Sequence, residues 1–151
     1  MAVTTLVRGR AAGALDPRQR QAAAKRLRVA LRALGRARAA VTLVFTDDQE
    51  IRVLNRTYRK HDRATDVLSF HLQALRGEDD PAAAGAGFNL GDIVISVETA
   101  RRRSPGRRLG RELERLAVHG LCHLFGHDHN RPKQARTMFA LQNRLLRLPP
   151  A

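Results

Sequence analysis

Hydrophobic residues recur along the chain with two different spacings, and these spacings predict where its helices and strands lie. Apolar residues at every third or fourth position form one face of a helix over residues 17–34, and the same spacing returns after Pro132. Short runs rich in Val, Ile, Leu and Phe are typical of strands, and they occupy residues 3–7, 41–46, 66–70 and 92–97. We therefore expect helices and strands to be interspersed along the chain.

Residues with strong conformational preferences stand at the ends of these segments. Asp16-Pro17 is a typical N-cap followed by a first helical residue, and Gly35 ends the helix that they begin. Residues 47–50 resemble a capping box and open a short helix that continues to residue 54. Another short helix is expected over residues 98–103, because Ser-Pro-Gly follows it directly.

The order of these segments predicts the fold class. We expect residues 1–151 to form a single α+β domain, in which a small mixed β-sheet of about four strands packs with about five helices. Residues 72–89 contain Asp, Pro and repeated Gly and Ala, and they predict a long, mobile surface excursion without regular structure.

The segment with the clearest chemistry is an apolar helix that carries histidines. Four of the six His residues lie in the segment from His119 to His129. From Leu116 to Phe125, every residue except His119 and His123 is apolar or Gly. Such a helix, beginning near residue 107, is expected to be buried nearly all round. His119 and His123 lie one turn apart on one face. Because a buried imidazole without a partner costs about 1–3 kcal/mol, this pair predicts a bound divalent metal.

The residues after this helix complete the predicted site. Gly126 is expected to end the helix, and His129 can then return to supply a third nitrogen. Three protein ligands with an open fourth position are typical of catalytic zinc sites, so we expect one Zn²⁺ per chain at the end of the buried helix. His127 is a fourth ligand, a proton-transfer group or, in the interpretation that we favour, a solvated turn residue. Asp128 either orients a ligand imidazole or caps the following helix.

Two further residues of this helix bear on the reaction class. Zinc proteases have a Glu general base directly after the first His, and this chain has Gly120 there, which disfavours peptide hydrolysis. Cys122 is the only cysteine, so no internal disulfide forms and a reducing cytoplasmic location is expected. A buried, inert thiol is the favoured interpretation of Cys122, with metal ligation as the alternative.

The charge of the chain indicates a polyanionic partner. The formal net charge is +14, and 25 of the 28 basic residues are Arg, the side chain that pairs best with phosphate. An excess of Arg over Lys is also typical of GC-rich genomes. A GC-rich genome would explain the Arg-to-Lys ratio, but it explains the positive sign of the net charge less well. One Tyr, five Phe and no Trp disfavour a broad base-stacking surface, so binding is expected mainly at phosphates. No apolar run reaches the length of a membrane span, and we expect no membrane association.

The histidine segment resembles a signature of the YbeY family of bacterial endoribonucleases. Residues 119–129 are similar to its pattern H-G-x-L-H-L-x-G-x-D-H and depart from it at Cys122. The resemblance extends over roughly residues 40 to 130, through Leu54-Asn-Arg-Thr-Tyr-Arg59, Thr65-Asp-Val-Leu-Ser-Phe70 and Leu90-Gly-Asp-Ile-Val-Ile-Ser96. The family usually has Pro in place of Ala64 and often has Tyr in place of His127.

This resemblance implies an activity and partners. Members act as zinc-dependent endoribonucleases on single-stranded RNA, in ribosomal RNA processing such as 16S 3′ end maturation and in ribosome quality control. The implied partners are single-stranded RNA, ribosomal RNA and ribosome-associated proteins, and no DNA is expected. The family has an Arg near the metal at the position of Arg59, where it would neutralise the charge that develops on a phosphoryl group under attack. We expect Arg59 and Lys60, in a loop over residues 58–61, to contact the substrate.

The resulting hypothesis is a hydrolase in which His119, His123 and His129 hold zinc, its bound water attacks phosphorus, and Arg59 is catalytic. Asp66 and Asp92 are expected only to support the metal ligands or cap strands. The alternative is a non-catalytic, basic ribosome assembly factor that binds ribosomal RNA and has a structural metal, with Cys122 or His127 closing the fourth position. A third hypothesis, a hydrolase of small phosphoesters or amides, does not account for the excess of Arg.

Overall fold

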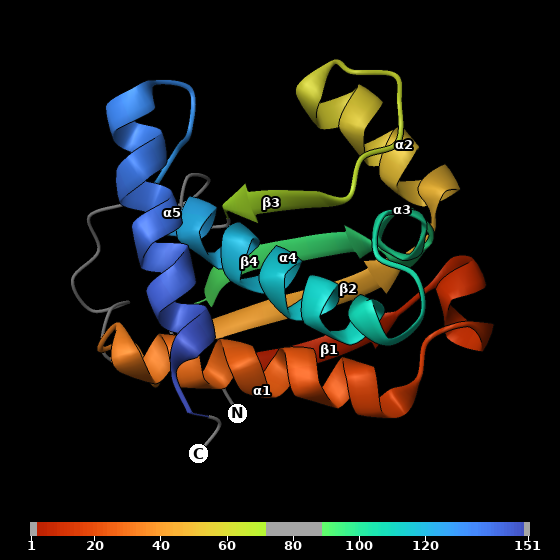
Figure 1. Ribbon diagram of the computed structural model, residues 1–151. Helices are drawn as coiled ribbons and strands as arrows, with labels where there is room; N and C mark the ends of the chain where they lie inside the picture. The colour runs from red at the N-terminus through yellow and green to blue at the C-terminus, as the bar shows by residue number, and fades with distance from the viewer. Residues whose placement is uncertain (1–2, 72–88, 150–151) are drawn as a thin grey trace.

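The computed structural model describes residues 3–71 and 89–149, and a four-stranded sheet lies at its centre (Figure 1). The strands are β1 (Val3–Val7), β2 (Ala40–Thr46), β3 (Val67–His71) and β4 (Asn89–Ser96), in the spatial order β1-β2-β4-β3. β1, β2 and β4 run parallel, and β3 pairs antiparallel with β4 at one edge. The predicted mixed sheet of four strands is confirmed. The predicted excursion over residues 72–89 lies outside the described residues, except for Asn89.

Five α-helices pack around this sheet in the described part of the chain, as predicted. They are α1 (Pro17–Ala33), α2 (Asp48–Arg59), α3 (Val97–Arg103), α4 (Leu109–Leu124) and α5 (Pro132–Arg147), and two short 3₁₀ helices, η1 (Gly9–Gly13) and η3 (Gly106–Arg108), precede α1 and α4. α1 and α4 lie side by side over one face of the sheet, with α5 packed against both (Figure 1). α2 covers part of the opposite face. None of the helices in the described part of the chain is long and apolar enough to cross a membrane.

The two faces of the sheet have cores of very different size. The main core joins α1, α4 and α5 to the sheet and includes the fully buried side chains of Leu27, Ile93 and Leu121. On the other face, the buried apolar side chains among the described residues are those of Val44, Ile51 and Val94, with partly buried neighbours around them. α2 therefore has little apolar burial to hold it, and its position depends more on polar contacts at its two ends.

α2 is longer than its sequence pattern indicated. The helix was expected to end near Leu54 and to be followed by a loop over residues 58–61, but it continues to Arg59 and ends at Lys60, which adopts a left-handed conformation with φ of 61°. The prediction of a loop was wrong for Tyr58 and Arg59, because no Gly or Pro interrupts residues 55–59 and an exposed helix end needs no apolar pattern.

At the other end of α2, hydrogen bonds fix its first turn. Asp47 is the N-cap, and its carboxylate accepts from the backbone N–H of Glu50 at 3.0 Å and of Arg10 at 2.8 Å. The predicted capping box is only half formed, because the Glu50 side chain turns away to accept from Thr46 Oγ1 at 2.7 Å and to pair with Arg8. Asp47 thus ties the N-terminal segment of the chain to the start of α2.

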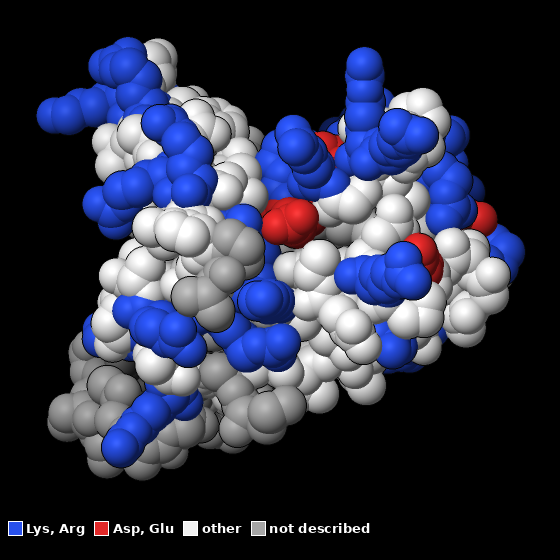
Figure 2. Space-filling model, turned by 60° about the horizontal axis from the view of Figure 1, so that its bottom comes forward, with Lys and Arg blue, Asp and Glu red and all other residues white. Residues whose placement is uncertain are grey.

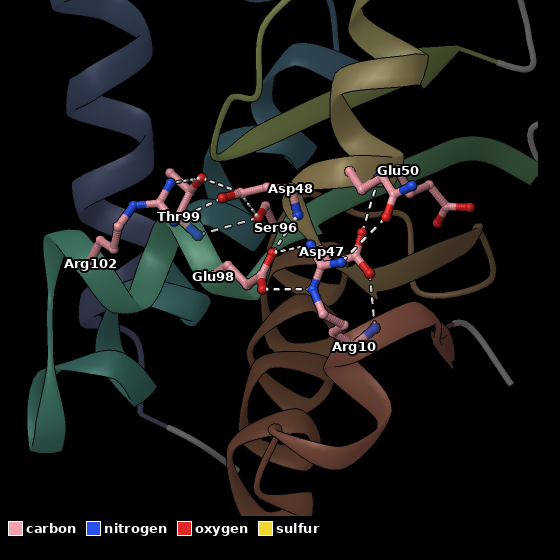
Figure 3. Close-up of polar contacts among 9 residues, drawn as sticks. Arg10, Asp47, Asp48, Glu50, Ser96, Glu98, Thr99 and Arg102 are labelled. Carbon is pink, nitrogen blue, oxygen red and sulfur yellow. Dashed lines mark hydrogen bonds and ion pairs between the residues drawn. The ribbon is translucent and has the colours of Figure 1, made fainter.

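Asp48 and Glu98 extend this network to α3, at the ends of the parallel strands β2 and β4 (Figure 3). The Asp48 carboxylate accepts from Ser96 Oγ and Thr99 Oγ1, both at 2.6 Å, and from Arg102 Nη1 at 2.7 Å. Burial opposes ionisation of Asp48, but these three donors outweigh it and hold the pKa of the carboxyl below its usual value. Glu98 in turn accepts from the backbone N–H of Asp48 at 2.9 Å.

α4 packs closely against the sheet at Gly120. A Cβ atom added there would lie 2.6 Å from Ile93 Cγ2 and 3.0 Å from Ser69 Oγ. The Ser69 hydroxyl also donates a hydrogen bond to the Gly120 carbonyl, at 3.0 Å. No side chain fits in this space without moving β3 or β4. The Glu of zinc proteases is therefore excluded from this position by packing.

Replacing this glycine is expected to destabilise the protein. Gly120→Ala should lower the free energy of unfolding by about 1–3 kcal/mol, because the added methyl group forces α4 away from Ile93. The measurement is denaturant unfolding followed by circular dichroism.

Gly110→Ala is the matched control in the same helix. Its Cβ would be 3.8 Å from the nearest atom of Gln19, an ordinary contact, so the substitution should be neutral or stabilising by up to about 1 kcal/mol. Equal effects of the two substitutions would contradict the packing argument.

Candidate metal centre

The last two turns of α4 and the loop after it bring three imidazoles together. His119 and His123 project from α4, His129 comes from the loop, and one nitrogen of each ring lies within 4.8 Å of the others. The Nε2 atoms of His119 and His123 are 3.2 Å apart. Two nitrogens bound to one tetrahedral zinc at the usual bond length are about 3.3 Å apart. The three histidines are therefore positioned to bind a metal ion, as the sequence predicted.

The turn that returns His129 to α4 depends on Gly126. Its φ is 88°, its N–H donates to the His123 carbonyl at 2.9 Å, and the N–H of His127 donates to the Cys122 carbonyl at 3.1 Å. This pair of hydrogen bonds is the Schellman ending of a helix, which favours glycine at the left-handed position. The prediction that Gly126 ends the helix is confirmed.

Asp128 shapes the loop and has neither of its predicted roles. Its carboxylate accepts from the backbone N–H of His129 and from Asn130 Nδ2, both at 2.7 Å. α5 begins after Arg131 without a side-chain cap, so Asp128 does not cap it. No imidazole is among its hydrogen-bond partners in the described part of the chain. Asp128 instead holds the backbone from which His129 projects.

The residue that orients an imidazole is Gln142, on α5. Its Oε1 lies 2.8 Å from Nδ1 of His119, and because an amide oxygen only accepts, Nδ1 carries the proton. The Nε2 lone pair of His119 is then free to bind a metal. Sequence reasoning missed Gln142, although a signal was present: it interrupts the apolar face of α5 between Met138 and Leu145, and it is buried.

The electrostatic surroundings favour neutral rings at this site. Burial lowers the pKa of His119 and of His123, and in each case the nearby His129 lowers it further. Neutral imidazole is the form that binds metals, so the site is prepared for binding near neutral pH. His129 is exposed, and its ring stacks on Phe139 of α5 at a centroid distance of 6.1 Å and an interplanar angle of 21°.

Neither residue proposed as a fourth ligand joins the cluster. Cys122 lies in the main core, and burial raises the pKa of its thiol to about 11, in agreement with a buried, inert thiol. His127 lines a separate pocket with Lys133 and Thr137. In residues 3–71 and 89–149, the metal-binding group consists of the three histidines alone. The arrangement is the open kind that leaves a coordination position for solvent or substrate.

A cavity of about 410 Å³ connects the three histidines to Arg59 and to residues 65–69 of β3 and the turn before it. Arg59 reaches it from the end of α2, where its guanidinium lies over the Phe70 ring at 5.1 Å and donates to the Ser69 carbonyl at 2.5 Å. Lys60 is exposed at the end of α2 and does not line this cavity. The structure thus brings Arg59, but not Lys60, to the candidate metal centre.

The two acidic residues singled out by the sequence lie on different sides of the sheet edge. Asp66 lines the cavity of the histidines and forms an ion pair with Arg103. Asp92 lines a second cavity, with Phe70 and Val94. Neither carboxylate belongs to the histidine group.

Basic side chains extend far beyond this site. Figure 2 shows Lys and Arg over much of the face to which α1 belongs, with few acidic groups among them. Seven Arg side chains form ion pairs with acidic residues in the described part of the chain. The formal net charge of +14 is the excess of basic over acidic residues, and these pairs do not reduce it. A surface of this kind attracts phosphate polyanions without selecting a sequence.

Known proteins resemble this chain over most of its length. The family model described as Endoribonuclease YbeY matches residues 13–148. The chain is 47% identical over 131 residues to a protein of Anaeromyxobacter dehalogenans, covering 83% of this chain and 64% of that protein. It is 50% identical over 112 residues to a protein of Moorella thermoacetica, covering 72% and 71% of the two chains. Both relatives are named Endoribonuclease YbeY.

The likeness also has limits of length and of fold. The chain spans less than two thirds of the Anaeromyxobacter protein. A Myxococcus xanthus relative of the same name is 48% identical over 108 residues, which cover 70% of this chain but only 35% of that protein. The solution structure of TM1509 from Thermotoga maritima matches with a TM-score of 0.57 at 24% identity, covering 95% of this chain and 86% of that one. This structural match concerns the fold alone.

The contact between Gln142 and His119 leads to a prediction about metal affinity. Gln142→Leu should weaken Zn²⁺ binding about 10- to 100-fold, because it removes the acceptor that fixes the His119 tautomer. Gln142→Glu retains an acceptor and should bind at least as tightly as the wild type. Competition with a chromophoric chelator at pH 7 measures both affinities, and an unchanged affinity in Gln142→Leu would contradict the orienting role.

Proposed function

The chain belongs to the YbeY family of endoribonucleases, and we propose that it is a metal-dependent endoribonuclease that cleaves single-stranded RNA. The observation that carries the proposal is the shared cavity, in which three histidines suited to a metal face an arginine suited to a phosphate. The proposed domain comprises residues 1–151, its catalytic residue is Arg59, and its metal ligands are His119, His123 and His129.

The histidine set favours Zn²⁺, one ion per chain. Three imidazoles are a common ligand set for catalytic zinc, and the burial of His119 and His123 keeps them in the neutral form that the ion requires. When bound, such an ion acts as a Lewis acid that polarises a phosphate oxygen and lowers the pKa of bound water. The remaining chemistry depends on side chains of this protein.

Arg59 is proposed to stabilise the transition state. Its guanidinium is held by the Ser69 carbonyl and the Phe70 ring, so it is already oriented before a substrate arrives. A fixed positive charge beside a phosphoryl group lowers the energy of the pentavalent transition state, which has more negative charge than the ground state on the oxygens it contacts. His127 lines a different pocket, so the proposal gives it no part in proton transfer.

RNA, and ribosomal RNA in particular, is the proposed substrate. The cavity lies between α2, β3 and α4, so a scissile phosphate reaches it more easily in a flexible single strand than in a duplex. The excess of Arg supports binding to a large RNA, and Lys60, exposed at the end of α2 next to Arg59 in the chain, is proposed to contact the backbone. We extend the proposal to processing of the 16S 3′ end and ribosome quality control in the cytoplasm, together with ribosome-associated proteins.

A basic surface would serve an RNA-binding assembly factor equally well, so this remains the second candidate. In that case the metal would only stabilise the end of α4. The open arrangement of the three histidines favours the enzyme, because a structural zinc normally has a fourth protein ligand.

The proposal predicts that RNA cleavage depends on the metal site. The purified protein should cut a labelled single-stranded RNA, and a chelator should abolish the cut and added Zn²⁺ restore it. His123→Ala, purified in the same way, should have no activity because it removes a ligand. Equal cleavage by both proteins would mean a contaminating nuclease, and intact RNA binding without cleavage would favour the assembly factor.

A separate prediction concerns Arg59. Arg59→Ala should lower kcat about 10²- to 10³-fold while the Zn²⁺ affinity stays unchanged, because the guanidinium acts on the phosphate and not on the metal ligands. Arg56→Ala removes the same charge from an exposed position on the same helix and is the matched control. Single-turnover cleavage measures the rate of both variants. An equal loss of rate in the two variants would mean that Arg59 contributes only general electrostatic attraction.

A further inference from the structure

A second cavity, of about 490 Å³, lies against the histidine cavity on the other face of the sheet. Its floor is apolar, from β2, β4 and the middle of α2, and its sides carry Tyr58 and Phe70. Arg59 and His71 line both cavities. A strand whose phosphate lies beside Arg59 in the first cavity can therefore place a neighbouring nucleotide in the second.

The aromatic side chains of this cavity are arranged to receive a flat ligand. Tyr58 is 61% exposed, and its ring packs edge-on against Phe70 at a centroid distance of 5.3 Å and an interplanar angle of 67°. The Arg59 guanidinium also lies over the Phe70 ring, 5.1 Å from its centroid. The composition of the chain disfavours a broad stacking surface, but two of its six Tyr and Phe residues meet here, which is sufficient for one base.

Asp92 gives the cavity a hydrogen-bond acceptor. It pairs in register with Phe70 across β4 and β3, so both side chains lie on the same face of the sheet. No hydrogen bond or ion pair reaches its carboxylate from the described residues, in contrast to the three donors on Asp48. Asp92 is exposed, so its carboxylate is accessible to a ligand, and partial desolvation beside the apolar floor raises its pKa.

We propose that this cavity binds one unpaired base of the RNA strand, stacked on Tyr58 and hydrogen-bonded through an amino group to Asp92. The inference rests on the proposed function, since it deepens the substrate recognition of the same site. Cytosine, adenine and guanine have an exocyclic amino donor for the carboxylate, whereas uracil has none, and its N3–H donor lies between two carbonyl oxygens that the carboxylate repels. The charge of Arg59, which lines both cavities, fits this occupant as well, whereas Arg8 is already paired with Glu50 at the same cavity.

The stacking role is tested by binding in the absence of metal, so that no strand is cut. Fluorescence anisotropy would measure the affinity for a ten-nucleotide RNA and for a ribose-phosphate strand of equal length without bases. Tyr58→Ala should weaken binding to the RNA about 5- to 100-fold and leave binding to the base-free strand unchanged. Tyr58→Phe keeps the ring and should match the wild type on both strands.

The outcomes separate this inference from the proposed function. If the wild type cleaves RNA and Tyr58→Ala loses nothing, or loses equally on both strands, the base site is disproved and the proposed function stands. If the wild type neither binds nor cleaves RNA, both fail. A change in oligomeric state in Tyr58→Ala, with RNA affinity intact, would assign the cavity to a second copy of the chain and overturn the inference.

The role of Asp92 is tested by base preference. The wild type should bind oligocytidylate about 5-fold or more tightly than oligouridylate, and Asp92→Ala should bring this ratio close to one. The ratio is the informative quantity, because loss of a negative charge strengthens binding to every RNA. A ratio that the substitution leaves unchanged would exclude the hydrogen bond to Asp92.

Discussion

The close packing of Gly120 on the edge of the sheet is the contact on which the rest of the site depends. Because residue 120 has no side chain, α4 comes within reach of Ile93, and Ser69 donates to its backbone carbonyl. This contact fixes both the height and the rotation of α4 over β3. His119 and His123, one residue before Gly120 and three after it, are thereby directed past the sheet edge toward the cavity that Arg59 lines. A bulkier residue would displace the candidate metal ligands and Arg59 relative to each other.

The other half of the site depends on α2, which is held mainly by its ends. Its apolar contact with the sheet involves few buried residues, but Asp47 and Asp48 bind its first turn to the N-terminal segment and to α3. At its last turn, Asn55 donates to the Arg63 carbonyl and Arg59 to that of Ser69. Two fixed ends leave a helix little freedom to slide. The guanidinium of Arg59 therefore has a defined place, although its helix has only a small core beneath it.

The parts of this structure that the sequence predicted are those set by neighbouring residues. Helical spacing placed His119 and His123 on one face, and the conformational preference of glycine ended α4 at Gly126, because both effects act within one or two turns. Gln142 could not be paired with His119 in the same way, since the two residues meet only when α5 packs on α4. The end of α2 was also missed, because an exposed helix terminus has no apolar pattern to mark it. The resemblance to a family indicated Arg59, but its contact with Ser69 depends on the tertiary fold.

The position of the candidate site at the β3 edge follows from how the other end of the sheet is used. In open parallel sheets, ligands usually bind beyond the carboxyl ends of the strands. Here the ends of β2 and β4 lead into the network of Asp48 and Glu98, whose oxygens already accept from Arg side chains, hydroxyls and backbone N–H groups. Such saturated carboxylates have no capacity for a ligand and would repel a phosphate. The antiparallel strand β3 offers the opposite conditions, with three imidazoles on one side, an aromatic pair on the other and Arg59 lining the cavities of both. The RNA strand proposed to cross this edge would meet positive charge and apolar surface there, away from the acidic end of the sheet.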